Sequence, residues 1–365
     1  MKEIKGLIFT PDFKFKPGVI YINGHKIDDV RYIGLDELGD SDREHYLIPG
    51  LIDIHMHGCI GEDVSNASVD GLMKVADYER SNGITSFCPA TMTLPIDVIG
   101  KQLEIIAGAE IKQIKGVYIE GPFISEKYKG AQNSKYIKRP DINLIRSLQQ
   151  KSKDLIKIVT IAPEIDGAIE MIDEGKEEFK FSIAHSASDY VTAMTAFDKG
   201  VSQVTHIYNG MPGYHHREPG IIGAAMDNTE VMVELIADGI HIHPSVVKNA
   251  FRQFGDERIV LVSDSMEATG LGDGNYSLGG DFVIVRDGVA RTADGAIAGS
   301  ISNLYECMKK AIAMGIRAES VIRAVTYNPA KAIGIENKVG SIAKGMDADI
   351  VILDSEYKIL DIICD

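Results

Sequence analysis

The sequence is poor in cysteine and in positive charge. Its four cysteines are Cys59, Cys88, Cys307 and Cys364, and no two of them form a CxxC pair. A disulfide framework or a zinc ribbon is therefore not expected, and the cysteines fit a reducing compartment. There are 38 lysines and arginines against 53 aspartates and glutamates, which gives a net charge of −15. Such an acidic chain repels phosphate backbones, which argues against nucleic acid as a partner.

Long apolar segments are also missing. The first residues, MKEIKGLIFTPDFKFKPG, lack the apolar core of a signal peptide. No apolar run approaches the roughly 20 residues that a membrane span requires. Neither a solenoid-type repeat nor a low-complexity segment stands out. These absences predict a cytoplasmic protein with no membrane partner, and the 45% hydrophobic and 25% charged residues are typical of a globular enzyme.

Both ends of the chain have the pattern of short strands and turns. Near the N-terminus, Asn23-Gly24 lies between two runs of alternating apolar residues, which is a strong hairpin signal. The C-terminal segment GSIAKGMDADIVILDSEYKIL also indicates turns and short strands. We therefore expect residues 1–48 and 340–365 to form one small β-sandwich domain, and residues 49–339 to form a second, larger domain.

The middle of the chain alternates between short apolar runs and segments of helical periodicity. Eight runs are rich in β-branched residues, from GLIDIHMH (50–57) to RIVLVSDS (258–265). Segments such as VDGLMKVADYERSNG separate them, with a glycine where the helix should end. Apolar strands that alternate with helices indicate a buried parallel sheet. Eight of them over roughly 215 residues match a (β/α)8 barrel of the α/β class.

Polar side chains stand at the ends of five of these eight runs. They are His55, His57, Glu120, His185, His206 and Asp264. The carboxyl ends of the strands in such a barrel point into one shared mouth, so these side chains should converge there. Each has an ordinary alternative when taken alone: a histidine at a strand end is commonly a satisfied polar residue, and Asp264 could cap the next helix. The joint pattern favours an active site.

The residue types in this set predict a metal centre. Imidazole and carboxylate groups bind Zn²⁺, Fe²⁺ or Mn²⁺ without any thiolate. Residues two apart on a strand face the same side, so His55 and His57 can bind one ion together. Glu120 could bridge two ions or complete one site, and Asp264 is placed to take a proton from an attacking water and return it later. We expect a hydrolase with one or two divalent ions per subunit.

Two further stretches follow the sixth and seventh runs. YNGMPGYHHREPG (208–220) brings His215, His216 and Arg217 together, a positive cluster that suits a phosphate or carboxylate. A solvated loop is the alternative for this stretch. ADGIHIHP (237–244) places His241 near the mouth, where an imidazole could hydrogen-bond a substrate carbonyl or hydroxyl. The start of a helix is the alternative there.

The sequence resembles the amidohydrolase superfamily along nearly its whole length, and within it the N-acetylglucosamine-6-phosphate deacetylases. PGLIDIHMHG resembles the first-strand signature of the superfamily, while EGPF, YNGMP and HHREPG in series resemble the more specific blocks of the deacetylases. The resemblance implies a metal-dependent enzyme that converts N-acetylglucosamine 6-phosphate, an amino-sugar phosphate, to glucosamine 6-phosphate and acetate. It also implies a homodimer, in which the Arg217 loop serves its own site or that of the neighbouring subunit.

The resemblance also implies roles for individual residues. Three residues would hold the principal metal, namely Glu120, His185 and His206. A second metal would be held by His55 and His57, with help from Glu120 and Asp264. Asp264 would be the acid and base, and His241 would orient the sugar and its acetamide. The substrate site would be lined by Ala131, Gln132, Asn209, Gly210, His216, Arg217, Ile297, Ala298, Gly299 and Ser300.

One departure from the family leaves the substrate open. Several relatives carry histidine where this chain has Gln132, so the N-acetylgalactosamine 6-phosphate epimer is an alternative substrate. Another amidohydrolase, acting on a cyclic amide, is a second alternative. Many of those enzymes use a carboxylated lysine as a bridging ligand, and no lysine stands at the tip of the third or fourth run. A non-catalytic metal or sugar-phosphate binding protein is a third alternative, which would not require Asp264.

Overall fold

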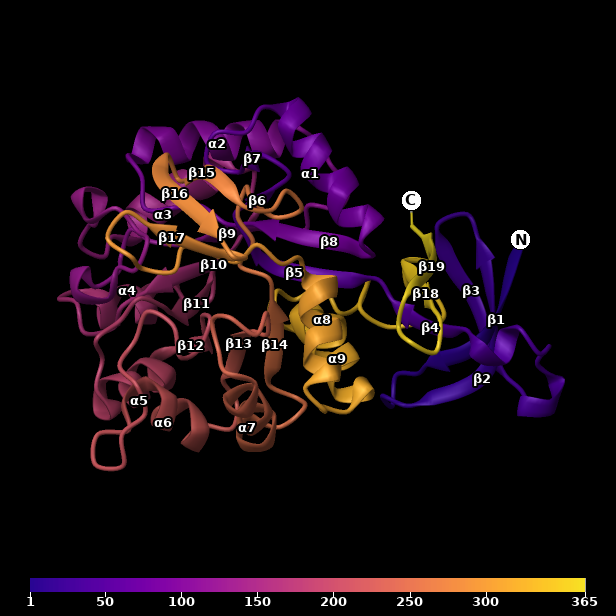
Figure 1. Cartoon of the computed structure of the whole chain (residues 1–365). Coiled ribbons are helices and arrows are strands. Elements are labelled where there is room, and N and C mark those ends of the chain that lie inside the picture. Colours follow the sequence, from indigo (N-terminus) through magenta and orange to yellow (C-terminus); the bar gives the residue numbers. More distant parts are fainter. Residues whose placement is uncertain (365) are drawn as a thin grey trace.

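A computed structural model of the chain describes residues 1–364 and has a mixed α/β architecture. Figure 1 shows a larger part, in which helices surround parallel strands, beside a smaller sheet that carries both chain ends. None of the helices within residues 1–364 combines the length and the apolar character needed to cross a membrane.

Six strands form a curved parallel sheet whose strand order follows the chain. They are β9 (Val117–Ile119), β10 (Ile156–Ile161), β11 (Lys180–Ile183), β12 (Val201–Val204), β13 (Met232–Ile236) and β14 (Ile259–Val262). A further parallel pair is formed by β5 (Leu51–Met56) and β8 (Ile84–Pro89). All eight apolar runs are therefore strands of parallel sheets, as predicted.

The parallel pair adjoins both edges of the six-stranded sheet. At one edge, a parallel bridge joins Ala90, just after β8, to Tyr118 in β9. At the other edge, the amide of Asp264, just after β14, donates to the carbonyl of His55 in β5 at 3.0 Å. The carboxyl ends of the first and last strands are thus brought together.

Ten helices lie among residues 1–364. They are α1 (Val69–Ser81), α2 (Ile96–Gly108), α3 (Ile142–Lys151), α4 (Ala168–Gly175), α5 (Tyr190–Lys199), α6 (Gly220–Asp227), α7 (Pro244–Phe254), α8 (Leu304–Ala313), α9 (Ala318–Val325) and α10 (Tyr327–Ala332). Several begin at a side chain that accepts a backbone N–H of the first turn, as Ser68, Asp141 and Asp189 do. Short 3-10 turns cover residues 35–37, 42–44, 126–128 and 134–136.

The parallel strands are buried on both faces. Every residue of β5, β8, β9, β13 and β14 is buried. Ile52 and Val260 belong to one apolar cluster, whereas Leu51 and Leu261 belong to a second, larger cluster that includes helix residues such as Leu72. Alternate side chains thus face two apolar cores, which is why the strand sequences are continuously hydrophobic.

The two chain ends share one six-stranded sheet. Its strands, in spatial order, are β19 (Ile359–Ile363), β18 (Ile350–Leu353), β4 (Tyr46–Pro49), β1 (Lys2–Phe9), β2 (Phe15–Asn23) and β3 (Lys26–Tyr32). The predicted hairpin is confirmed, since β2 and β3 pair antiparallel and are joined by a turn of Gly24, whose φ is +58°, and His25. The predicted β-sandwich is not confirmed. Within the described residues, one set of apolar side chains of this sheet packs with Ile342 and Met346, which lie in an irregular segment and not in a second sheet. Another set, including Ile48 and Val351, belongs to the large apolar cluster of the helices and parallel strands.

A small antiparallel sheet follows the eighth parallel strand and was not expected. It consists of β15 (Gly274–Leu278), β16 (Asp281–Arg286) and β17 (Val289–Thr292). Its apolar side packs with Met92 and Met266, which follow β8 and β14 at their carboxyl ends. A two-residue pair, β6 (Gly58–Cys59) and β7 (Glu62–Asp63), lies after β5. Both additions extend the carboxyl end of the parallel sheet.

Candidate metal centre and active site

The six polar residues at the strand ends converge. Each lies within two residues of the carboxyl end of a parallel strand. They are His55 and His57 (β5), Glu120 (β9), His185 (β11), His206 (β12) and Asp264 (β14). Five of them line one cavity of about 340 Å³, and His55 lies fully buried beneath it. Residues spread over more than half of the chain therefore form one polar cluster.

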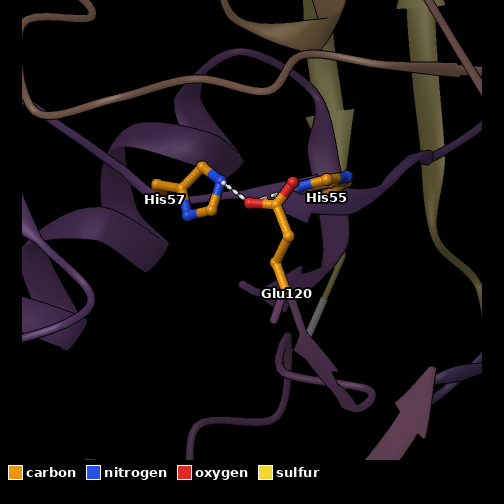
Figure 2. A group of neighbouring side chains, drawn as sticks. All are labelled: His55, His57 and Glu120. Atoms are coloured by element: carbon orange, nitrogen blue, oxygen red, sulfur yellow. Dashed lines mark ion pairs between the residues drawn. The ribbon is translucent and has the colours of Figure 1, made fainter. Parts of the chain in front are cut away.

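Glu120 lies between two pairs of histidines. Its Oε1 atom is 3.0 Å from Nε2 of His185 and 3.0 Å from Nε2 of His206. Its Oε2 atom is 3.1 Å from Nε2 of His57 and 3.7 Å from Nε2 of His55. Figure 2 shows the carboxylate reaching between the two rings of the second pair. Each pair, together with Glu120, places three ligand atoms within 4.8 Å of one another.

Asp264 adjoins the His55–His57 pair. Its Oδ1 atom is 3.3 Å from Nε2 of His57 and 3.8 Å from Nε2 of His55. Because its side chain also borders the cavity, Asp264 can reach both the ligand cluster and a molecule in the cavity.

In three of the histidines, the second ring nitrogen, Nδ1, has its own hydrogen-bond partner, which fixes the orientation of the ring. Nδ1 of His55 lies 3.1 Å from Oε2 of Glu234. Nδ1 of His57 lies 3.2 Å from the carbonyl oxygen of Ala90, and Nδ1 of His185 lies 2.8 Å from the carbonyl oxygen of Tyr128. These acceptors take an Nδ1–H, which leaves the Nε2 lone pair free to bind a metal. The buried Nε2 of His55 has no hydrogen-bond partner of its own. The donor set therefore fits divalent metal ions.

The electrostatics of the cluster also favour a cation. Burial raises the pKa of Glu120, but His55, His185 and His206 outweigh it and hold that pKa well below its usual range. Burial opposes the charge on His57 as well, yet its contacts with Asp264 and Glu120 raise its pKa to about 9. Two ionised carboxylates in a buried site attract positive charge, which a metal ion supplies.

Three of the six residues share an unusual backbone conformation. His185, His206 and Asp264 each lie two residues after a strand and have φ of +44°, +28° and +50°. Few residues other than glycine adopt this left-handed region, and such strain concentrates at functional sites. The repeated conformation places the side chain at the equivalent point of each strand end.

His241 borders the same cavity and is held by a carboxylate. Its Nδ1 atom is 2.7 Å from Oδ2 of Asp238, whose Oδ1 accepts the backbone N–H groups of Ile240 and His241, both at 2.9 Å. The helix that follows, α7, begins only at Pro244, with His243 as its N-cap. His241 is therefore part of the cavity wall and not of the helix.

Two carboxylates in this arrangement were missed from the sequence. Glu234 lies fully buried in β13, where its Oε1 accepts the Tyr118 hydroxyl at 2.9 Å and its Oε2 faces His55. The signal for it was an acidic residue with apolar neighbours on both sides, in the segment VMVELIA (231–237) of the seventh run. Asp238, three residues before His241, supports that ring in the same way, but nothing in its local pattern distinguishes it from a turn residue.

The expected substrate residues divide into those that line the cavity and those that do not. The cavity is lined by Ala131, Gln132, Asn209, Gly210, Ile297 and Gly299. Ala298 is buried next to it, and Ser300 supports Asp264 by donating its backbone N–H to the Asp264 carbonyl at 2.7 Å. His216 and Arg217 lie on an exposed loop with their side chains 2.7 Å apart, outside this cavity.

The comparison with known families agrees with this geometry. The model of the amidohydrolase family matches residues 46–364 of the chain. The chain belongs to the amidohydrolase family. Amidohydrolases generally depend on divalent metals, and the two groups of histidines around Glu120 in this amidohydrolase agree with that dependence.

This amidohydrolase is similar in sequence to enzymes named as deacetylases of amino-sugar phosphates. It is 37% identical to the N-acetylglucosamine-6-phosphate deacetylase of Bacillus subtilis (strain 168), over 98% of this chain and 94% of the relative. It is also 35% identical to the N-acetylgalactosamine-6-phosphate deacetylase of Escherichia coli O157:H7, over 85% and 84% of the two chains.

Solved structures resemble this amidohydrolase over its full length. The N-acetyl-D-glucosamine-6-phosphate deacetylase of Mycobacterium smegmatis superposes with a TM-score of 0.93 at 28% identity, and covers 100% of this chain and 98% of the other. A mutant of the same enzyme in complex with N-acetyl-D-glucosamine 6-phosphate superposes equally well, over 99% and 97% of the two chains.

Proposed function

We propose that this amidohydrolase removes the acetyl group from N-acetylglucosamine 6-phosphate and releases glucosamine 6-phosphate and acetate. The observation that carries the proposal is the position of Glu120, shared by two histidine pairs, with Asp264 3.3 Å from His57 in the same cavity. The relative from Bacillus subtilis bears the name of this activity, and the Mycobacterium smegmatis enzyme has been solved with this sugar phosphate. Amide hydrolysis needs an activated water and a proton for the departing amine, and this cluster can serve both needs.

The metal ligands are assigned by pairs. Glu120, His185 and His206 would hold the principal ion, and His55 and His57 would hold a second ion with Glu120 and Asp264. Zn²⁺ and Fe²⁺ suit a set of imidazoles and carboxylates, and Mn²⁺ is also accepted. When bound, such an ion lowers the pKa of water and polarises the acetyl carbonyl.

Asp264 carries the proton in this scheme. It accepts a proton from the attacking water as the new C–O bond forms at the acetyl carbon. It then donates that proton to the amide nitrogen as the C–N bond breaks, so that the amine leaves neutral. His241, held by Asp238, faces the cavity and orients the sugar and its acetamide.

The remaining substrate contacts come from the cavity wall and from the Arg217 loop. Ala131, Asn209, Gly210, Ile297 and Gly299 would line the sugar site, with Ala298 and Ser300 supporting that wall. Arg217 and His216 would bind the phosphate and so position the amide for attack. The exposed position of this loop favours a homodimer in which Arg217 reaches the site of the neighbouring subunit.

The finer architecture belongs to the same proposal. We propose that residues 49–339 form a closed (β/α)8 barrel and that residues 1–48 and 340–365 form a small β domain, of which residue 365 lies outside the described part. The hydrogen bond between the Asp264 amide and the His55 carbonyl supports closure, because it joins the ends of the first and last strands.

An acetate-release assay tests the proposed function. The protein would be reconstituted with Zn²⁺, Fe²⁺ or Mn²⁺ and supplied with the 6-phosphates of N-acetylglucosamine and N-acetylgalactosamine, and with N-acetylglucosamine itself. We expect the highest kcat/KM for N-acetylglucosamine 6-phosphate, and loss of activity after chelation. Preference for the galactosamine epimer would favour the second candidate, which the Escherichia coli relative supports. No activity on any of the three would overturn both.

A further inference from the structure

We infer that Gln132 is a positioning residue that holds the Glu120 carboxylate between the two metal sites, and does not bind the sugar. The inference deepens the proposed function and rests on it for the identity of the metal ligands. It starts from the contacts that the Gln132 side chain makes inside the protein.

The side chain of Gln132 is buried and hydrogen-bonded to other residues of the protein. It is only 2% exposed, although it borders the cavity. Its Nε2 atom donates to Oε2 of Glu120 at 2.7 Å, and its Oε1 atom accepts the backbone N–H of Thr93 at 2.7 Å. The second N–H direction meets the sulfur of Met92 at 3.5 Å. Both N–H directions of this amide and one of the two acceptor sites of its oxygen are therefore used within the protein, and the side chain is buried, which disfavours a role in binding a sugar hydroxyl.

The orientation of the amide follows from its partners. The Thr93 N–H can only donate, and the ionised Glu120 carboxylate can only accept. Rotating the amide by half a turn would set its oxygen against the carboxylate oxygen and its NH₂ against the Thr93 N–H. Both contacts would then be repulsive, so Gln132 has one stable orientation, with its NH₂ group toward Glu120.

Gln132 differs in kind from the other neighbours of Glu120. Within residues 1–364, the remaining side-chain partners of this carboxylate are the four histidines, which approach it through Nε2. Those nitrogens are the atoms that would bind metal. The Gln132 amide is a true hydrogen-bond donor, so it can fix the carboxylate plane whether or not metal is bound.

The loop that carries Gln132 supports a second ligand as well. The backbone N–H of Gln132 donates to the carbonyl of Lys129 at 2.9 Å. In the preceding turn, the carbonyl of Tyr128 lies 2.8 Å from Nδ1 of His185. The same short loop therefore orients one imidazole and the shared carboxylate. Because Gln132 contacts Oε2, its loss should weaken the His55–His57 side more than the other side.

Metal binding measured without substrate tests this inference. Gln132→Leu removes the amide donor and leaves a side chain of similar size. Gln132→Met is a second variant, which also keeps the length of the side chain. We expect the Zn²⁺ affinity of the site that contains His55 and His57 to fall about 10- to 100-fold, as measured by competition with a chromophoric chelator. The metal content per subunit after dialysis should fall accordingly.

A matched control separates this role from the general cost of losing a buried amide. Gln102, in α2, is 4% exposed and donates to the carbonyl of Ala67 at 3.2 Å, away from the cavity. Gln102→Leu should retain wild-type zinc affinity. The melting temperature of each metal-free variant shows whether it still folds.

Substrate kinetics separate the two roles of Gln132. A sugar-binding role predicts a higher KM in the Gln132 variants at unchanged zinc affinity, and that result would overturn the inference. Wild-type zinc affinity in both Gln132→Leu and Gln132→Met would overturn it as well. Since zinc binding is measured without a sugar, failure of the proposed deacetylase activity in the wild-type protein would be a separate result.

Discussion

The two halves of the metal centre, on either side of Glu120, are built differently. On the His185–His206 side, both Nε2 atoms lie 3.0 Å from Oε1, and both residues have left-handed backbone conformations. On the His55–His57 side, the distances to Oε2 are uneven at 3.1 and 3.7 Å, and the histidines lie in or next to a regular strand. The first half is the more symmetric ligand set.

The surroundings of the two halves differ in charge. The His55–His57 side adjoins Asp264 and is supported by the buried Glu234, whereas His185 is supported by a backbone carbonyl. Extra carboxylates add negative charge and a group that can move protons. The difference agrees with the proposal that the His185–His206 half holds the principal ion, and that the His55–His57 half combines metal binding with proton transfer.

The largest expected effect comes from removing the proposed proton carrier, Asp264, which adjoins the His55–His57 half. Asp264→Asn keeps the size of the side chain but cannot accept a proton, so kcat should fall by about 10²- to 10⁴-fold. Metal content should largely survive, because the four histidines and Glu120 remain. Acetate release and elemental analysis would measure the two quantities, and near-normal turnover would remove Asp264 from its assigned role.

The next prediction compares the loss of one histidine from each half. His206→Ala should lose the principal ion and lower kcat by roughly 10²- to 10³-fold, because a bound ion contributes several kcal/mol to transition-state stabilisation. His57→Ala should lose the second ion and lower kcat only about tenfold, because Glu120, His185 and His206 remain. Metal content and acetate release measure both.

A histidine outside the cavity provides the control for that pair. His45 lies 3.9 Å from Asp42, near the terminal sheet, so His45→Ala should keep both metal content and kcat. Equal losses in His206→Ala and His57→Ala would break the comparison and indicate that the two ions act as one unit.

A smaller effect is expected from a change at Glu234, which supports His55 in the His55–His57 half. Glu234→Gln removes the negative charge that faces Nδ1 of His55 while it keeps the size of the side chain. Outer supports of this kind contribute about 10- to 100-fold to metal affinity, so one of the two zinc sites should weaken within that range. Calorimetric titration with Zn²⁺ would resolve the sites, and two unaltered sites would show that Glu234 only fills space.

The smallest effect should come from a change at Asp238, which supports His241; both residues lie outside the two halves. Asp238→Asn replaces the charge-assisted hydrogen bond that orients this ring by a neutral one, which is weaker by about 1 kcal/mol, or roughly five- to tenfold. We expect a higher KM for the sugar phosphate at unchanged metal content. A change in metal content with an unchanged KM would place Asp238 in the metal centre.

Predictions from the sequence were most reliable where they depended on local pattern. The eight parallel strands and the hairpin at Asn23-Gly24 could be located because apolar periodicity and turn residues act over a few neighbours. The convergence of Glu120, His185, His206 and Asp264 could be expected because parallel strands present their carboxyl ends at one edge. The β-sandwich could not be established, since strand pairing alone does not tell whether one sheet or two will form.

The sequence by itself determined which residues stand at the strand ends and which metals their side chains can accept. Only the tertiary structure decided how those side chains are held. Glu234 meets His55 across 179 positions of the chain, and Gln132 meets Glu120 with the Thr93 amide behind it. Hydrogen bonds of this kind depend on distances of about 3 Å and on the direction of each donor, and neither follows from a spacing in the sequence.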